Sequence, residues 1–157
     1  MRRQSARLMR DWAWKLGIAV LLSGWLHGCS SDGVTPNPSV AALVGDWTAD
    51  SLVLTSVANP DVSVELIATG ATFALNVQPS GQYTAILIAG GKSSTEIGWL
   101  STSGAAITLQ RTFPSADSTT GTYAQSGDRL TIDGRTDYEF VHGVKEAATE
   151  HLVLIKQ

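Results

Sequence analysis

Short runs of alternating apolar and polar residues, separated by turn signals, fill the chain from Thr48 onward. Phe73, Leu75 and Val77 alternate with smaller or polar residues, the period of two expected of a half-buried strand. No segment after Cys29 shows a long helical period. The candidate strands are Thr48–Ser56, Val62–Ala68, Ala71–Val77, Gln82–Ala89, Thr95–Ser101, Ala105–Arg111, Thr119–Gln125, Arg129–Asp133, Thr136–Val141 and Thr149–Lys156. About ten short strands at this spacing predict an all-β fold, either a closed barrel or a sandwich.

A hairpin pattern occurs twice in the second half of the chain. Gly98–Leu109 and Gly121–Ile132 each contain an entry glycine, an aromatic or apolar strand, a Ser-Gly turn, and a strand with threonine between aliphatic residues. The turn glycine supplies the positive φ that such hairpins often require. Hairpins in series predict up-and-down connectivity, and closing the sheet into a barrel would remove its edge strands.

A short motif precedes the first candidate strand. Ser39–Val44 is expected to form one helical turn capped by Ser39. The residues Leu43-Val44-Gly45-Asp46-Trp47 resemble the Gly-x-Trp opening of lipocalin-like (calycin-type) domains of bacterial lipoproteins. The resemblance implies an antiparallel up-and-down β-barrel of about eight to ten strands over residues 39–157. It also implies that Gly45 and Trp47 are fold-motif residues, with Trp47 beneath the helical turn and against a basic side chain, for which Lys156 is placed.

The first 28 residues have the features of a targeting segment. Basic residues up to Lys15 precede the apolar run 16–26. This run of about eleven residues suits a signal peptide and is short of the roughly twenty that span a bilayer. Leu26-His27-Gly28-Cys29 resembles the lipobox of bacterial lipoproteins, in which the cysteine receives diacylglycerol. We therefore expect a signal peptide over 1–28 and, over 29–38, a lipidated Cys29 with a flexible tether whose small polar residues and prolines offer no apolar face.

Cys29 is the only cysteine, so it cannot form an internal disulfide. Lipidation accounts for it, and several acyl chains, such as palmitate, anchor a protein stably where a single chain does not. By the same resemblance, Ser30 after the cysteine favours the outer membrane. The sequence thus predicts a protein of the cell envelope that is anchored to the membrane by lipid on Cys29.

Charge argues against nucleic acid as a partner. The first 28 residues hold five of the 11 basic residues and one of the 14 acidic residues, so the remainder carries a net charge near −7. A surface of this sign repels phosphate backbones.

No catalytic residue, cofactor site or metal site is predicted. His142 and His151 have glutamates nearby and could share a metal only if their strands pair in a suitable register, so solvated histidines are the simpler interpretation. No nucleophile context and no phosphate-binding glycine loop before a helix is present. We therefore expect a protein that is not an enzyme.

A ligand cavity is the function that such a barrel most readily allows. The candidate cavity residues are Phe73, Leu75, Tyr83, Leu87, Leu100, Tyr123, Tyr138 and Phe140. Many alternate positions carry small residues, which leaves room for a small hydrophobic ligand. The alternative is a barrel filled by its own side chains, belonging to an interaction or structural lipoprotein whose loops engage envelope proteins. An open apolar cavity would favour ligand binding. A collapsed interior with an exposed apolar patch would favour the interaction or structural role.

Overall fold

The computed structural model describes residues 35–157. The expected signal peptide over 1–28 and the lipidated Cys29 lie outside the described residues, as does the first part of the expected tether. Among residues 35–157, no helix is long and apolar enough to cross a membrane.

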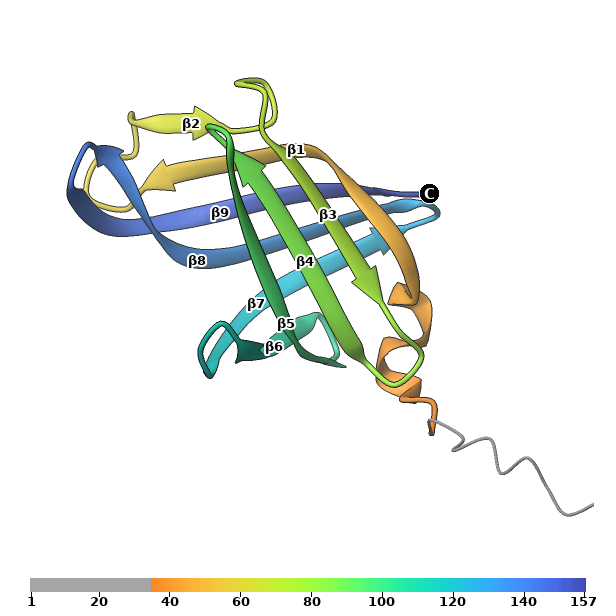
Figure 1. The fold of residues 1–157 in the computed structure, drawn as a ribbon. Coiled ribbons are helices and arrows are strands. Elements are labelled where there is room, and N and C mark those ends of the chain that lie inside the picture. Colours follow the sequence, from red (N-terminus) through yellow and green to blue (C-terminus); the bar gives the residue numbers. More distant parts are fainter. Residues whose placement is uncertain (1–34) are drawn as a thin grey trace, which may run out of the picture. The chain divides into compact units, whose positions relative to one another are not determined.

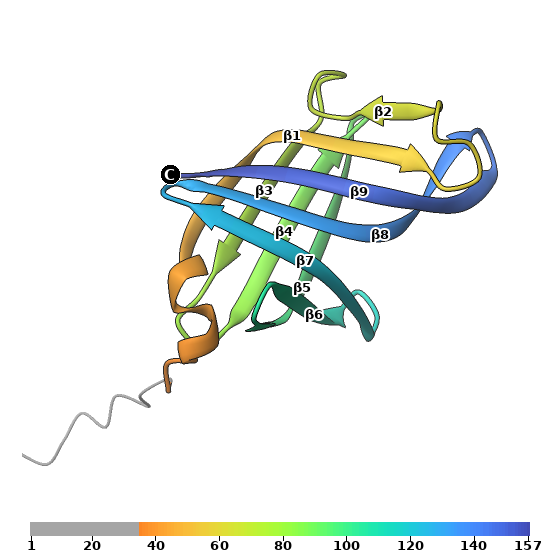
Figure 2. The ribbon, with the colours of Figure 1, turned by 180° about the vertical axis from the view of Figure 1, so that it is seen from behind.

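The described chain is an antiparallel, up-and-down, closed β-barrel of eight strands, with one short additional strand, β2 (Figure 1). The elements are η1 Pro38–Leu43, β1 Gly45–Ser56, β2 Ser63–Glu65, β3 Thr72–Val77, β4 Gln82–Ala89, β5 Lys92–Ser103, β6 Ala106–Phe113, β7 Asp117–Ser126, β8 Arg129–Val141 and β9 Val144–Lys156. Strands β3 to β9 pair in chain order, and β9 returns to pair with β1, as the view from behind shows (Figure 2). The predicted all-β barrel is confirmed.

Several boundaries differ from the expected strands, among them that of β9, which begins at Val144 rather than at Thr149. The separate candidates Arg129–Asp133 and Thr136–Val141 are one strand, β8, because β9 pairs with both halves across Gly134. The candidate Val62–Ala68 shrinks to Ser63–Glu65, because the chain turns at Leu66, whose carbonyl accepts hydrogen bonds from the N–H groups of Thr69 and Ala71. This turn returns the chain toward β3.

Both predicted hairpins are present. In the first, β5 and β6 are joined through Gly104, which has a φ of 59°, and in the second β7 and β8 are joined through Gly127, with a φ of 57°. Both values lie in the left-handed region that glycine adopts without strain. The repeated pattern therefore marks two consecutive up-and-down hairpins of the barrel wall.

Strand β1 bends and pairs with three strands. Its first residues, Gly45 to Thr48, pair with β3, and Val53 to Thr55 pair with β2, while β9 accompanies it along most of its length. The β1–β9 register shifts between Ala49 and Ser51, as at a β-bulge, which bends the bulged strand and increases its twist. Just beyond, the backbone N–H of Leu52 donates to the Glu65 carboxylate at 2.7 Å.

The helix η1 closes one end of the barrel. Asn37, rather than the expected Ser39, is the capping residue, because its Oδ1 accepts from the backbone N–H of Ser39 at 3.1 Å and Pro38 occupies the first turn. The Asn37 N–H donates to the carbonyl of Pro79, so the folded part begins slightly before the expected boundary. Val40 and Leu43 of η1 are buried in the same apolar cluster as Trp47.

Candidate functional site

Trp47, Lys156 and Gly45 lie together at the closed end. The Trp47 side chain is 1% exposed, and its Nε1–H donates to the Leu43 carbonyl at 2.8 Å. Lys156 is opposite Trp47 on β9, and its Nζ lies 5.2 Å from the ring centroid, a cation–π distance. Gly45 has a φ of 131°, and a Cβ there would lie 2.9 Å from Lys156 Cε. The three residues therefore hold η1, β1 and β9 together rather than line a cavity.

The barrel interior contains a cavity of about 700 Å³. Its lining includes four of the candidate residues, which are Phe73, Leu75, Tyr83 and Leu87. Further apolar walls come from Leu52, Ala85, Ile107, Leu109, Ile132 and Leu152. The volume is within the range of roughly 300–1,000 Å³ typical of small-molecule sites.

The other four candidate residues do not line this cavity. Leu100 is 2% exposed and belongs to the packed apolar cluster that also contains Trp47. Tyr123 packs against that cluster as well. Tyr138 and Phe140 pack edge to face with ring centroids 4.9 Å apart, on the part of β8 that has left β7. Their period of two placed these residues on the inner face of the sheet, but the curvature of the sheet decides which of them border empty space.

A group of polar residues, absent from the sequence-based set, lines the same cavity. Arg111 of β6 donates through Nη1 to Glu96 of β5 at 2.9 Å and through Nη2 to Asp117 of β7 at 3.0 Å. Its Nε donates to the Ser115 carbonyl at 3.0 Å. The hydrogen bond that Arg111 donates to Glu96 raises the pKa of Arg111 above its usual value, and the Glu96 and Asp117 charges add to the effect. Glu96, Arg111 and Asp117 are an even number of residues from Leu100, Ile107 and Tyr123 on their respective strands, and so lie on the same face of the sheet. This spacing is the sequence signal that indicates their inward position.

Two further polar groups border the cavity. Glu150 of β9 faces inward with Leu152, and burial raises its pKa above the usual value, with a smaller contribution from the Glu96 charge. Tyr83 is 1% exposed, and burial raises the pKa of its phenol to about 12, with Glu96 adding to the shift. Within residues 35–157, the Tyr83 hydroxyl makes no hydrogen bond. The cavity is therefore lined by apolar and by polar side chains, and the polar ones include Arg135, Asp137 and Lys145 as well.

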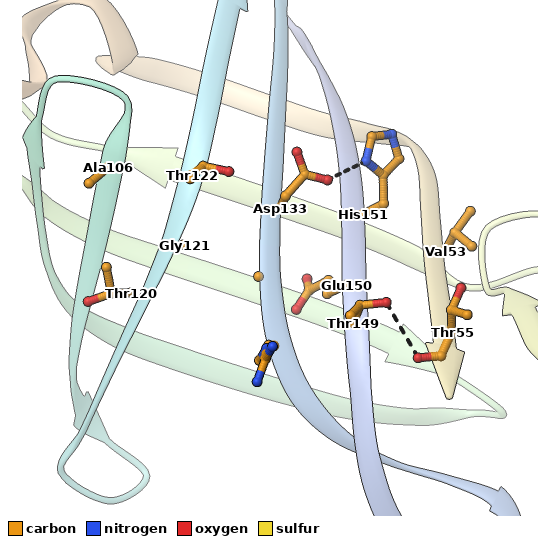
Figure 3. A pocket seen from close by; sticks show the side chains of 12 residues that line it. Val53, Thr55, Ala106, Thr120, Gly121, Thr122, Asp133, Thr149, Glu150 and His151 are labelled. Carbon is orange, nitrogen blue, oxygen red and sulfur yellow. Dashed lines mark hydrogen bonds and ion pairs between the residues drawn. The ribbon is translucent and has the colours of Figure 1, made fainter. Parts of the chain in front are cut away.

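The barrel wall is interrupted where β7 leaves β8. Their pairing runs from Ser126–Arg129 to Thr122–Asp133 and then stops, although both strands continue (Figure 3). A second hollow lies on the outside at this point, and it shares with the cavity the lining residues Gly121, Gly134, Arg135 and Glu150. Figure 3 shows the Glu150 carboxylate extending from β9 in the direction of β8. Two of the four shared residues are glycines, so the wall here has few side chains between the two hollows.

The two histidines do not meet. His142 is in the turn between β8 and β9, whereas His151 lies along β9 opposite Asp133, with its Nδ1 2.6 Å from Asp133 Oδ1. Over the described range 35–157, no three histidine, cysteine, aspartate or glutamate side chains gather in a manner that could hold a metal ion.

The fold and the cavity define a closed, eight-stranded antiparallel β-barrel that could hold a ligand, an architecture compatible with a calycin-like fold. Comparison with protein-family models, with curated proteins and with solved structures gave no match.

Proposed function

We propose that this protein is a membrane-tethered, lipocalin-like lipoprotein that binds a small, mainly hydrophobic molecule inside its barrel and performs no catalysis. The observation that carries the proposal is the cavity of about 700 Å³, part of whose lining is apolar. A filled barrel would have no such volume, so the hollow interior favours binding over the purely structural alternative. Phe73, Leu75 and Leu87 from adjacent strands supply apolar contact for the ligand body.

Gly134 offers a direct test of where the ligand lies. It borders the cavity, and a Cβ added there would have no atom within 4 Å, so Gly134→Leu would place a bulky side chain in open space. We expect the purified full chain to bind Nile red, with the fluorescence increase that accompanies transfer into an apolar site. Gly134→Leu should weaken this binding by about tenfold, the effect of roughly 1.4 kcal/mol.

The matched control is Ser118→Leu, which adds the same side chain at an exposed position of β7 that borders neither hollow. It should bind Nile red as the unmodified chain does. Equal affinities for Gly134→Leu and the unmodified chain would place the dye outside the barrel and overturn the proposal.

The tether is proposed from the sequence alone. The lipobox-like residues Leu26-His27-Gly28-Cys29 support cleavage before Cys29, acylation of that cysteine and attachment to the outer membrane. Intact mass spectrometry of protein extracted from membranes is the test. A chain that begins at Cys29 and carries diacylglyceryl and acyl additions, lost in Cys29→Ala, is the expected result. An unmodified chain that retains Met1 would contradict it.

A second function, contact with an envelope protein, is favoured by the outer face of β4 and β5. Ile86, Ile88 and Trp99 are exposed there, and exposed apolar side chains on neighbouring strands often mark an interaction surface. A photo-crosslinking residue at position 99 should then yield a discrete adduct in intact cells, while one at the exposed position 118 should not. Equal yields at the two positions would argue against a specific contact.

A further inference from the structure

The polar region of the cavity contains more carboxylates than cations. Glu96, Asp117, Asp137 and Glu150 border the cavity as carboxylates, and Arg111, Arg135 and Lys145 border it as cations. Arg111 lies between Glu96 and Asp117 and pairs with both. The phenol of Tyr83 borders the same space. The negative charge of Glu96 contributes to raising the pKa of both Tyr83 and Glu150, so Glu96 is close enough to interact electrostatically with each of them.

Arg111 is already occupied by contacts within the protein. Each of its three nitrogens donates a hydrogen bond, to Glu96, to the Ser115 carbonyl and to Asp117. An anionic ligand approaching Arg111 would meet the two carboxylates that hold it. Contact with Arg111 is therefore unfavourable for a carboxylate or phosphate head group.

Glu150 has the opposite character. Among the described residues it forms no salt bridge and no side-chain hydrogen bond. The residues opposite it are Leu54 on β1 and Gly134 on β8, and neither has a side-chain donor. An inward carboxylate without a donor is costly to ionise, and this cost falls when a cation binds beside it.

The Tyr83 hydroxyl is a second buried group in need of a partner. The side chain is almost fully buried, and its Oη finds no hydrogen-bond partner in the part of the chain that the structure describes. Since its pKa is raised to about 12, the phenol stays neutral at physiological pH, with an oxygen able to accept. Tyr83 therefore holds a buried polar atom that has no partner among the described residues, in a side chain that borders the cavity.

We propose that the cavity selects amphipathic amines, with the ammonium group bound by Glu150, Glu96 and the Tyr83 hydroxyl and the apolar body against Phe73, Leu87 and Leu109. An ammonium group has three N–H donors and no acceptor, which matches a site with two carboxylates and a phenol oxygen. This inference rests on the proposed function, because it specifies the ligand of that same cavity.

Three eight-carbon probes that differ only in the head group test the inference. Octylamine, octanol and octanoate are titrated into the purified full chain by isothermal titration calorimetry, with blank titrations into the same buffer. We expect octylamine to bind at least about tenfold more tightly than octanol, as charge-assisted hydrogen bonds to a buried site would give. Octanoate should bind most weakly of the three.

Glu150→Gln should reduce the preference for octylamine over octanol to less than about threefold, because the amide keeps the shape but not the charge. Glu146→Gln is the matched control, since Glu146 is on the same strand and does not border the cavity. It should keep the full preference. The ratio of two affinities measured on one sample does not depend on the fraction of folded protein.

The pH dependence of octylamine binding gives a second test of the inference. The charged groups around Glu150 are Glu96 on β5, Arg111 on β6, Asp117 on β7, Asp133, Arg135 and Asp137 on β8, and Lys145 and His151 on β9. The pKa of Glu150 is raised, and a cation prefers the ionised carboxylate, so octylamine should bind more tightly as pH rises through that pKa. Octanol affinity should change less over the same range.

The outcomes separate the two proposals. Octanol binding as tightly as octylamine would overturn the preference for amines and leave the hydrophobic cavity standing. Octanoate binding most tightly would overturn it as well and identify Arg111 as the dominant charge. Binding of none of the three probes, together with no binding of Nile red, would overturn the proposed function itself.

Discussion

The indole N–H of Trp47 donates to the backbone carbonyl of Leu43 at 2.8 Å, in a fully buried position. The bond links the last residue of η1 to the start of β1, and it satisfies a carbonyl at the helix end that would otherwise have no partner. Lys156 approaches the same ring from β9. One tryptophan therefore joins the helix that closes the barrel to the two strands whose pairing completes it.

Replacing Trp47 by phenylalanine should lower the free energy of unfolding by about 1–3 kcal/mol, because the Leu43 carbonyl loses its buried donor. Urea denaturation of the full chain measures the change. Trp99→Phe is the control, since Trp99 is 48% exposed, and it should alter stability by less than about 0.5 kcal/mol. Equal effects of the two substitutions would show that the hydrogen bond contributes nothing.

Replacing Lys156 by glutamine should remove the cation from the face of Trp47 and cost about 0.5–2 kcal/mol. Lys156→Arg, which keeps the charge, should recover most of the loss. Lys92→Gln, at the exposed start of β5, serves as the control and should have little effect. Urea denaturation of the three variants checks this order of stabilities. A loss for Lys156→Arg as large as that for Lys156→Gln would exclude the cation–π contribution.

Glu65 should make stability depend on pH in the acid range. Its carboxylate accepts from the backbone N–H groups of Leu52 and Ala68, and these hydrogen bonds hold the pKa of Glu65 below its usual value. The contribution is present above the unfolded-state pKa and is lost as pH falls through the folded-state pKa. Denaturation of the unmodified chain and Glu65→Gln at a series of pH values should therefore give curves that converge in acid.

The matched control for Glu65→Gln is Asp61→Asn, which removes one negative charge from an exposed turn. It should change stability near neutral pH by less than about 0.5 kcal/mol. If the stability of Glu65→Gln and that of the unmodified chain run parallel through the acid range, the acid-range pH dependence does not come from Glu65.

Two glycines at the β7–β8 divergence should respond in opposite ways to alanine. A Cβ at Gly121 would lie 2.3 Å from the Asp133 carbonyl oxygen, so Gly121→Ala must push β7 and β8 apart and should cost about 1–3 kcal/mol. A Cβ at Gly134 meets nothing within 4 Å, and Gly134→Ala should be neutral or stabilise by about 0.4–1 kcal/mol. Thermal denaturation of the two variants decides, and equal effects would show that the strands do not approach closely there.

The alternation of residues was sufficient to predict the barrel, because each half-buried strand has a period of two that a helix cannot share. The Ser-Gly dipeptides correctly marked two hairpin turns, since Gly104 and Gly127 have the positive φ such turns need. The interruption in β8 was wrong, because Gly134 ends no pairing with β9 even though it offers no side chain to pack.

The polar region of the cavity was not predicted, although the spacing of its residues along the strands indicates that they face inward. Glu96 lies on the same face of its strand as Leu100, and Glu150 on the same face as Leu152, but hydrophobicity alone does not mark a charged residue as facing inward. The divergence of β7 from β8 has no local signal. It depends on the twist and curvature of the whole sheet, and that curvature also separates Phe73, which borders the cavity, from Tyr138, which does not.

The pairing of β1 with β9 also determines when this chain can fold. Gln157 donates through its backbone N–H to the Asp46 carbonyl at 2.9 Å and through Nε2 to Thr48 Oγ1, a separation of 109 residues. Contacts between such distant positions slow folding because a long loop must close first. The edge of β1 that faces β9 therefore has no partner until β9 has been synthesised, and the barrel stays open until then.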